Sequence, residues 1–275
     1  MKAILVFIFT IIVLPGCLVG LRAEKSDVNT LRLQPASGMV RAELKYFDPP
    51  AQCAGALVLC PGYNQDGEFL IRQKEWQDLA QKHRLILVGL SFASKEEDLG
   101  ASERRGYYYV ERGSGEILLA ELEKITSRDL SIVIFGHSGG AHFAHRFVYQ
   151  FPDRVRAWGA YGFGWHDEAP AASKAKPPGV FICGLKDERL GSTREAFLSG
   201  LRSQWPVCWL GVPGSGHVID SKASVWVRSY FDAILSQPSN APGVWSKASD
   251  RGLEGFLVRC WFPNEKIKKS WEQFP

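Results

Sequence analysis

The sequence predicts an α/β protein whose central sheet is mostly parallel and carries helices on both faces. Short apolar segments rich in β-branched residues alternate with longer segments of helical periodicity. Two of the apolar segments, Ala56–Cys60 and Ile132–Phe135, are continuous hydrophobic runs, as expected for strands buried on both faces. Because ligands bind at the carboxyl ends of the strands in such sheets, we expect a three-layer fold with its site at that edge.

The expected elements follow one another in strand–helix alternation, which favours crossover connections and a parallel strand order. Val40–Phe47 precedes Asp48-Pro49-Pro50 and is expected to be an edge strand. The other strands are expected at Ala56–Cys60, Leu85–Leu90, Ser131–Gly136, Val155–Tyr161, Val180–Cys183 and Val207–Leu210, and the helices at Glu68–His83, Glu116–Ile125, Ser138–Gln150, Thr193–Ser203 and Lys222–Leu235.

Length and composition favour one domain. The chain has 275 residues, 45% of them hydrophobic, which is enough to bury a core without a disulfide framework. We expect a single domain over residues 24–275, with a Trp-rich C-terminal extension from about residue 237. The formal net charge is only +4, and no Lys/Arg run is dense enough to predict nucleic-acid binding. The segment Phe92–Gly113 is too long for a plain connection and is a candidate lid.

The N-terminal 23 residues predict export. Lys2 is followed by the apolar run Ala3–Leu14 and then by a Pro-Gly break, the pattern of a secretory signal. Cys17 follows this break in a sequence that resembles a lipoprotein lipobox, so lipidation is an alternative. An apolar run extended to Leu21 would allow an uncleaved anchor. The chain is therefore expected to be periplasmic, extracellular or membrane-anchored, and to meet a membrane only through this segment.

Five cysteines lie outside this leader. Cys60, Cys183 and Cys208 lie at or near the ends of apolar strands and are expected to be buried free thiols. A disulfide between Cys53 and Cys260 would suit an oxidising compartment, and the sequence leaves it open. The tail tryptophans are expected to dock the C-terminus onto the body of the protein; they are Trp245, Trp261 and Trp271.

The segment Gly136–Gly140 carries the strongest catalytic signal. Its sequence, Gly-His-Ser-Gly-Gly, has the form G-x-S-x-G and lies between an expected strand and an expected helix. This setting places a serine on a tight turn with its hydroxyl above the sheet, and the helix N-terminus favours a developing oxyanion. We therefore expect Ser138 to be a nucleophile. The alternative is a serine that caps the N-terminus of a core helix.

A serine nucleophile needs a base, and His217 is the candidate. It is the only histidine in the last third of the chain, and it lies on a Gly-rich turn after an expected strand. Asp187 follows another strand and is the candidate acid that orients the imidazole. The resulting order of Ser138, Asp187 and His217 is the one expected for this arrangement. Glu188 and Asp167 are alternative acids.

The oxyanion and the substrate need further groups. A Pro-Gly turn after a buried strand makes the amide of Tyr63, together with that of Gly139, the expected pair of oxyanion donors. Aromatic and basic side chains in the neighbouring loops are candidates for substrate binding; they are Arg105, Tyr107 and Trp165. His142 and His145 lie one helical turn apart, but no carboxylate or cysteine accompanies them at ligand spacing, so no metal site is expected.

These motifs together resemble the α/β-hydrolase superfamily over roughly residues 40–236, and within it the secreted serine esterases of feruloyl-esterase-like and polyhydroxyalkanoate-depolymerase-like type. The motifs that carry the resemblance are Pro61-Gly62-Tyr63, Gly136-His137-Ser138-Gly139-Gly140, Gly184-Leu185-Lys186-Asp187 and Gly216-His217. The resemblance implies two-step acyl transfer from a small-molecule or polymer ester, with no metal and no organic cofactor. Two alternatives stay open: a serine peptidase of prolyl-oligopeptidase type, and a non-catalytic surface binding protein.

Overall fold

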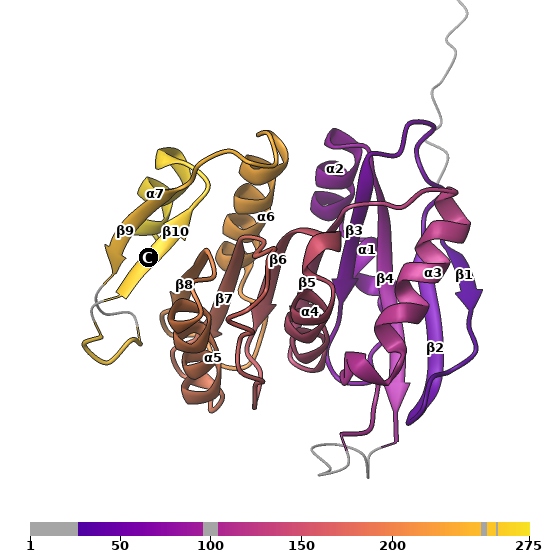
Figure 1. Cartoon of the computed structure of the whole chain (residues 1–275), viewed down its shortest axis with the longest axis horizontal. Helices are drawn as coiled ribbons and strands as arrows, with labels where there is room; N and C mark the ends of the chain where they lie inside the picture. The colour runs from indigo at the N-terminus through magenta and orange to yellow at the C-terminus, as the bar shows by residue number, and fades with distance from the viewer. Residues whose placement is uncertain (1–26, 96–103, 249–251, 257) are drawn as a thin grey trace, which may run out of the picture.

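An eight-stranded sheet forms the centre of the computed structural model, which describes residues 27–95, 104–248, 252–256 and 258–275 (Figure 1). Its strand order is β1-β2-β4-β3-β5-β6-β7-β8. β1 and β2 run antiparallel to their neighbours and the other pairs are parallel. The sheet is therefore mostly parallel, as predicted. The strands are β1 (Asn29–Arg32), β2 (Met39–Tyr46), β3 (Gly55–Cys60), β4 (Leu85–Ser94), β5 (Ile132–His137), β6 (Val155–Tyr161), β7 (Gly179–Gly184) and β8 (Val207–Val212).

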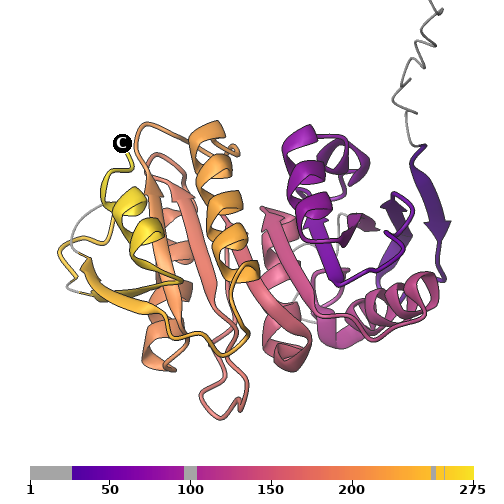
Figure 2. The same ribbon diagram turned by 90° about the horizontal axis from the view of Figure 1, so that it is seen from above.

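Helices cover both faces of this sheet. Figure 2 shows α2, α6 and α7 on one side and α3, α4 and α5 on the other, which confirms the expected three layers. The helices are α1 (Glu68–Ile71), α2 (Lys74–Lys82), α3 (Ser114–Thr126), α4 (Gly139–Gln150), α5 (Leu190–Arg202), α6 (Ser221–Leu235) and α7 (Glu265–Glu272), and single 3₁₀ turns lie at η2 (Val110–Arg112) and η3 (Pro152–Arg154).

The core lies between the sheet and these two helical layers. Every residue of β3, β4, β7 and β8 is buried, as expected for strands that are covered on both faces. The largest fully buried side chains are aromatic, among them Trp158, Phe143 and Phe181. Each such side chain contributes about 1.5–3 kcal/mol through its burial. The rigid centre therefore fixes the strand ends from which the catalytic candidates extend.

Three expectations at the level of elements were wrong. The strand expected at the edge of the sheet, β2, has β1 outside it, because the short polar segment Asn29–Arg32 pairs with it. The single helix expected over Glu68–His83 is split at Gln73, whose ψ of 120° is extended. β4 continues to Ser94 because it pairs with β2 along its length, so part of the candidate lid is strand.

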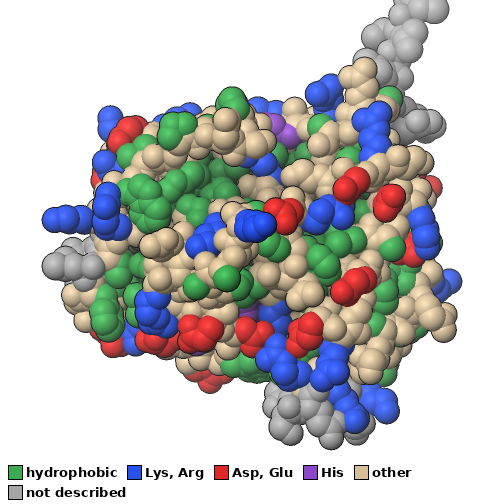
Figure 3. Space-filling view, in the orientation of Figure 1, with side chains coloured by type: hydrophobic (Ala, Val, Ile, Leu, Met, Phe, Trp, Pro, Cys, Tyr) green, Lys and Arg blue, Asp and Glu red, His purple; other side chains and the backbone are tan. Residues whose placement is uncertain are grey.

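The C-terminal extension forms a hairpin, β9 (Val244–Ala248) and β10 (Val258–Phe262), followed by α7. Trp271 donates a hydrogen bond from its indole to the carbonyl of Trp209 at 2.6 Å, and Trp261 meets the ring of Tyr230 edge-on. These two tryptophans therefore dock as expected. Trp245 does not dock in this way, because 41% of it is exposed. In Figure 3, hydrophobic side chains gather at the upper left, over this part of the molecule, while acidic and basic side chains are mixed along the lower edge.

The described cysteines are all buried and free. Cys53 and Cys260 therefore form no disulfide with each other. Within the described ranges, no helix combines the length and the apolar character that a bilayer crossing requires. The expected leader, residues 1–23 with Cys17, lies outside the described residues, as do residues 96–103 of the candidate lid.

Candidate active site

Ser138 lies on a strained turn between β5 and α4. Its φ of 55° and ψ of −119° are rare for a residue that is not glycine. Its amide donates to the carbonyl of Tyr161 at 2.9 Å, and its own carbonyl accepts from the amides of Ala141 and His142. The side chain makes no capping hydrogen bond to α4, unlike an ordinary N-cap serine. This geometry is that of a nucleophile elbow.

The glycines on either side of this turn are required by close backbone contacts. A Cβ atom at Gly136 would collide with the carbonyl of Gly140. A Cβ atom at Gly140 would collide with the carbonyls of Cys60 and Pro61 at the end of β3. The first and last glycines of the motif therefore let α4 begin directly against the end of β3, which brings Ser138 next to the loop after that strand.

His217 and Asp187 form a hydrogen-bonded pair. Nδ1 of His217 lies 2.8 Å from Oδ2 of Asp187, although 30 residues separate them along the chain. The side chain of Asp187 is fully buried, and its Oδ1 accepts the backbone N–H of Arg189 at 3.0 Å. Gly162, at a φ of +59°, passes beside the pair, and a Cβ atom there would lie 2.9 Å from Oδ2 of Asp187. Three loops at the carboxyl edge of the sheet thus converge on one hydrogen-bonded pair.

Two opposing effects set the pKa of the Asp187 carboxyl. Burial raises the pKa of the Asp187 carboxyl, but the hydrogen bonds from the Arg189 amide and from His217 outweigh it, so the net pKa is below its ordinary value. Asp187 is therefore a carboxylate near neutral pH. A buried carboxylate on Nδ1 keeps the proton on that nitrogen and leaves Nε2 of His217 as the basic atom.

The two alternative acids are engaged elsewhere. Asp167 accepts hydrogen bonds from Arg104 at 2.7 and 2.9 Å and from Nε of the buried Arg146 at 2.8 Å. Burial alone would raise the pKa of the Asp167 carboxyl, but these two arginines lower it by more, so the net pKa lies well below the ordinary range. Glu188 is exposed and pairs with Arg189 at 2.8 Å. In the described structure neither carboxylate contacts His217, so the geometry favours Asp187.

His137 connects His217 to the nucleophile turn. Its ring stacks on that of His217 with 4.9 Å between centroids, and it directly precedes Ser138 in the chain. The part of the chain that the structure describes contains no hydrogen bond between the Ser138 hydroxyl and His217; such nucleophile–base bonds are often longer in unliganded enzymes. Sequence analysis assigned His137 no role. The available signal was its place beside the serine in the motif.

The two expected oxyanion donors lie together. A Cβ atom at Gly139 would be only 2.9 Å from the amide nitrogen of Tyr63, so the start of α4 and the loop after β3 are in close contact. The same point lies 2.6 Å from the hydroxyl of Tyr107. Glycine at position 139 therefore leaves the space that this hydroxyl fills. Helix α4 begins here, and its N-terminus adds a positive dipole end to the site.

Several solved structures share this architecture. The S-formylglutathione hydrolase of Agrobacterium tumefaciens has a TM-score of 0.57, with 13% identity over 75% of this chain and 93% of its own. Fluorophosphonate-binding serine hydrolase F of Staphylococcus aureus has a TM-score of 0.54, with 15% identity over 77% of this chain and 99% of its own. The LpqC poly(3-hydroxybutyrate) depolymerase of Bordetella parapertussis has a TM-score of 0.53, with 16% identity over 78% of this chain and 92% of its own.

The chain has the α/β-hydrolase fold. No family model and no curated protein sequence matches it, so the likeness is one of structure. In this fold the nucleophile follows a central strand and the acid and the histidine follow later strands in that order. Here Ser138 follows β5, Asp187 follows β7 and His217 follows β8, so each candidate occupies the corresponding place.

The three candidates for substrate contact differ in how far they are exposed. Tyr107 is only 4% exposed, and its hydroxyl lies against Gly139, one of the two expected oxyanion donors, so its contact with substrate stays a prediction. Trp165 is half-buried, with its ring 4.0 Å from that of His142. Arg105 is exposed. Across the described ranges, no three His, Cys, Asp or Glu side chains converge as metal ligands.

Proposed function

We propose that this chain is a serine hydrolase that cleaves a carboxylic ester through an acyl-enzyme. The observation that carries the proposal is the His217–Asp187 hydrogen bond of 2.8 Å, together with a strained Ser138 whose sequence neighbour His137 stacks on His217. A buried carboxylate that orients a histidine next to such a serine has a clear chemical use in nucleophilic catalysis. The three solved structures support it, because each is named as a hydrolase or a depolymerase.

In the first step, the Ser138 hydroxyl attacks the acyl carbonyl while Nε2 of His217 takes its proton. Asp187 stabilises the imidazolium that forms. The negative oxygen of the tetrahedral intermediate is bound by the amides of Gly139 and Tyr63, and each such donor typically contributes about 3–4 kcal/mol to the transition state. The intermediate collapses as His217 protonates the leaving alcohol.

In the second step, the same groups release the acyl chain. His217 removes a proton from water, which attacks the ester carbonyl of acylated Ser138. A second tetrahedral oxyanion forms at the same donors. Its collapse returns the proton to Ser138 and releases the carboxylic acid, so no metal or organic cofactor takes part. Trp165, Tyr107 and Arg105 are the proposed contacts with substrate.

A panel of chromogenic substrates tests the reaction class. Purified protein is assayed with p-nitrophenyl esters of graded acyl length, with feruloyl esters and with peptidyl p-nitroanilides. Turnover of esters that exceeds turnover of anilides, and that is lost in Ser138→Ala, supports the proposal. Ser229→Ala, at an exposed position of α6, is the matched control. Turnover of anilides alone would point to a peptidase, and no turnover with any substrate would point to a binding protein.

We also propose that the chain is exported through residues 1–23. The basic start, the apolar run and the Pro-Gly break support this. Expression of the full chain in a bacterial host, followed by fractionation and N-terminal mass analysis, tests it. An N-terminus shortened near Cys17, or a diacylglyceryl mass on that cysteine, identifies the form of processing. An intact N-terminus in the cytoplasmic fraction would contradict export.

A further inference from the structure

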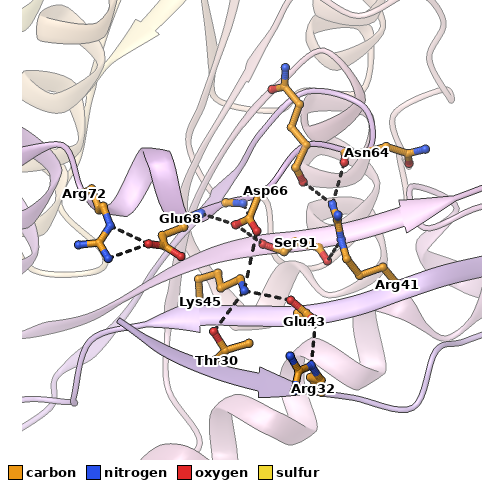
Figure 4. A network of polar contacts seen from close by, with 12 residues as sticks. Thr30, Arg32, Arg41, Glu43, Lys45, Asn64, Asp66, Glu68, Arg72 and Ser91 are labelled. Atoms are coloured by element: carbon orange, nitrogen blue, oxygen red, sulfur yellow. Dashed lines mark hydrogen bonds and ion pairs between the residues drawn. The ribbon is translucent and has the colours of Figure 1, made fainter. Parts of the chain in front are cut away.

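Arg41 on β2 binds the loop that carries Tyr63. We call Gly62–Asp66 the oxyanion loop. One guanidinium nitrogen of Arg41, Nη2, donates to the carbonyls of Asn64 at 2.7 Å and Gln65 at 2.9 Å, and Nε donates to the carbonyl of Ser91 on β4 at 3.1 Å (Figure 4). A single side chain thus joins the two backbone positions after Tyr63 to a central strand of the sheet.

The strand pattern of β2 explains why this arginine reaches the loop. Arg41, Glu43 and Lys45 alternate with the buried Ala42 and Leu44, so the three charged residues share one face of the strand. The pairing of β2 with β4 shifts register between Met39 and Arg41, which marks a bulge directly before the arginine. Figure 4 shows Arg41 and Lys45 extending from β2, and Ser91 from β4, toward the loop.

Other contacts hold the same loop to β4. The Asn64 side chain makes two hydrogen bonds to the backbone of Ser94, at 2.8 and 2.9 Å, and holds a left-handed φ of 59° at Asn64. The Asp66 carboxylate accepts from the Ser91 hydroxyl at 2.8 Å. Lys45 lies 3.8 Å from the same carboxylate and 3.0 Å from Glu43. Arg41 completes this network, because it fixes backbone carbonyls where the others fix side chains.

We propose that Arg41 is a positioning residue that holds the Tyr63 amide in line with the oxyanion. This inference rests on the proposed function. An oxyanion donor acts only if its N–H is aimed in advance at the point where negative charge develops. Small rotations of its peptide therefore weaken the binding of the transition state more than the binding of the ground state. The carbonyls that Arg41 binds belong to the two residues after Tyr63, with the Tyr63–Asn64 peptide unit between them and the Tyr63 N–H. Arg41 therefore acts by holding the short oxyanion loop in place against β4, which limits how far the Tyr63 peptide can rotate.

The three donor contacts of Arg41 require the fixed geometry of a guanidinium. A lysine at this position keeps the charge but offers a single nitrogen, which cannot reach all three carbonyls in the same arrangement. Arg41→Lys therefore separates geometry from charge, and Arg41→Met removes both. Arg32→Gln is the matched control, since Arg32 belongs to the same network through Glu43, has a side chain that is 83% exposed and makes no hydrogen bond to the oxyanion loop in the described structure.

The experiment measures kcat and KM for p-nitrophenyl acetate and the inhibition constant of an arylboronic acid, which forms a tetrahedral adduct with an active serine. We expect Arg41→Met to lower kcat about 10- to 100-fold and Arg41→Lys about 3- to 10-fold, with KM changed less than about threefold. The boronate inhibition constant should rise by the factor by which kcat/KM falls. Arg32→Gln should stay within about twofold of wild type in both measurements.

Each outcome of this experiment either supports or overturns the positioning role of Arg41. If both Arg41 variants keep kcat within twofold of wild type, or if kcat/KM falls without a matching rise in the boronate constant, the positioning role is wrong. Circular dichroism melting identifies a variant that fails to fold, and if Arg41→Met does so, Arg41→Lys carries the test. A wild-type protein that neither turns over esters nor binds the boronate overturns the proposed function together with this inference. An active wild type with unaffected Arg41 variants overturns this inference alone.

Discussion

The imidazole of His137 stacks on that of His217, with 4.9 Å between the ring centroids. Nε2 of His137 is buried and has no hydrogen-bond partner in the described structure. Burial, reinforced by repulsion from His217, lowers the pKa of His137 to about 4. His137 is therefore neutral near pH 7, so it presents a flat ring surface and no positive charge to the histidine that we propose as the base.

This contact predicts that catalysis depends on the flat ring of His137 and not on the ring's nitrogen atoms. We expect His137→Phe to keep kcat for a p-nitrophenyl ester within about threefold of wild type, and His137→Ala to lower it about tenfold, because loss of the ring frees His217 to rotate away from Ser138. Steady-state kinetics at pH 8 measure both. Equal kcat values for the phenylalanine and alanine variants would contradict the role of the stack.

The same histidine predicts part of the pH dependence of stability. Between pH 6.5 and about 4 an unfolded His137 is protonated while the folded one is neutral, so the free energy of unfolding falls as the pH is lowered through this window. His145, with a pKa lowered to about 3 by burial and by Arg146, acts in the same direction. His137→Phe should lose less stability than wild type from pH 7 to pH 5, by about 1–2 kcal/mol in urea unfolding. Parallel curves for the two proteins would contradict it.

Replacement of the buried acid should affect the chemical step rather than binding. Asp187→Asn removes the charge that holds the tautomer of His217, and such a change costs about 10⁴ in kcat in a related triad. We expect a loss of about 10³–10⁴ with KM nearly unchanged. Glu188→Gln, next in sequence and exposed, should retain wild-type kinetics. If Glu188→Gln or Asp167→Asn lost as much activity as Asp187→Asn while still folding normally, the assignment of the acid would be wrong.

The glycine at position 140 should be intolerant of any side chain. Its Cβ would collide with the carbonyls of Cys60 and Pro61, which are backbone atoms of a central strand end and cannot move aside cheaply. We expect Gly140→Ala to lower the free energy of unfolding by about 3 kcal/mol or more, as overpacking at such sites does. Gly191→Ala in α5 is the control, because nothing lies within 4 Å of its added Cβ. Thermal unfolding of both variants measures the difference, and equal melting temperatures would contradict the close contact.

Local patterns in the sequence were sufficient for the centre of the fold. The continuous apolar runs of β3 and β8 gave boundaries within two residues of those observed, because strands buried on both faces leave an unbroken hydrophobic signal. The motif around Ser138 also predicted its turn, since the close approach of Gly140 to β3 demands a residue without a side chain. The prediction failed at the periphery of the sheet. β1 has the polar sequence Asn-Thr-Leu-Arg and becomes a strand only because β2 offers it an edge.

The candidate site divides in the same way. Spacing and order indicated Asp187 and His217, and the structure brings them within hydrogen-bond distance. Tyr107 was predicted to bind substrate because aromatic residues in a long loop favour that interpretation; tertiary packing buries its ring and brings its hydroxyl to Gly139. Arg41 was missed altogether. Its contacts reach 23 and 24 residues along the chain to two backbone carbonyls, and such contacts leave no trace in the residue types of the loop.

The most direct test of the account is the reactivity of Ser138 toward a fluorophosphonate. A fluorophosphonate probe modifies a serine only when a neighbouring base activates it and an oxyanion site accepts the phosphoryl oxygen. Intact-mass spectrometry should show one probe per wild-type chain with the adduct on Ser138, no adduct on Ser138→Ala, and labelling of His217→Ala slowed by at least about 10³-fold. Equal labelling of wild type and Ser138→Ala, or no labelling of a folded wild-type protein, would contradict the account.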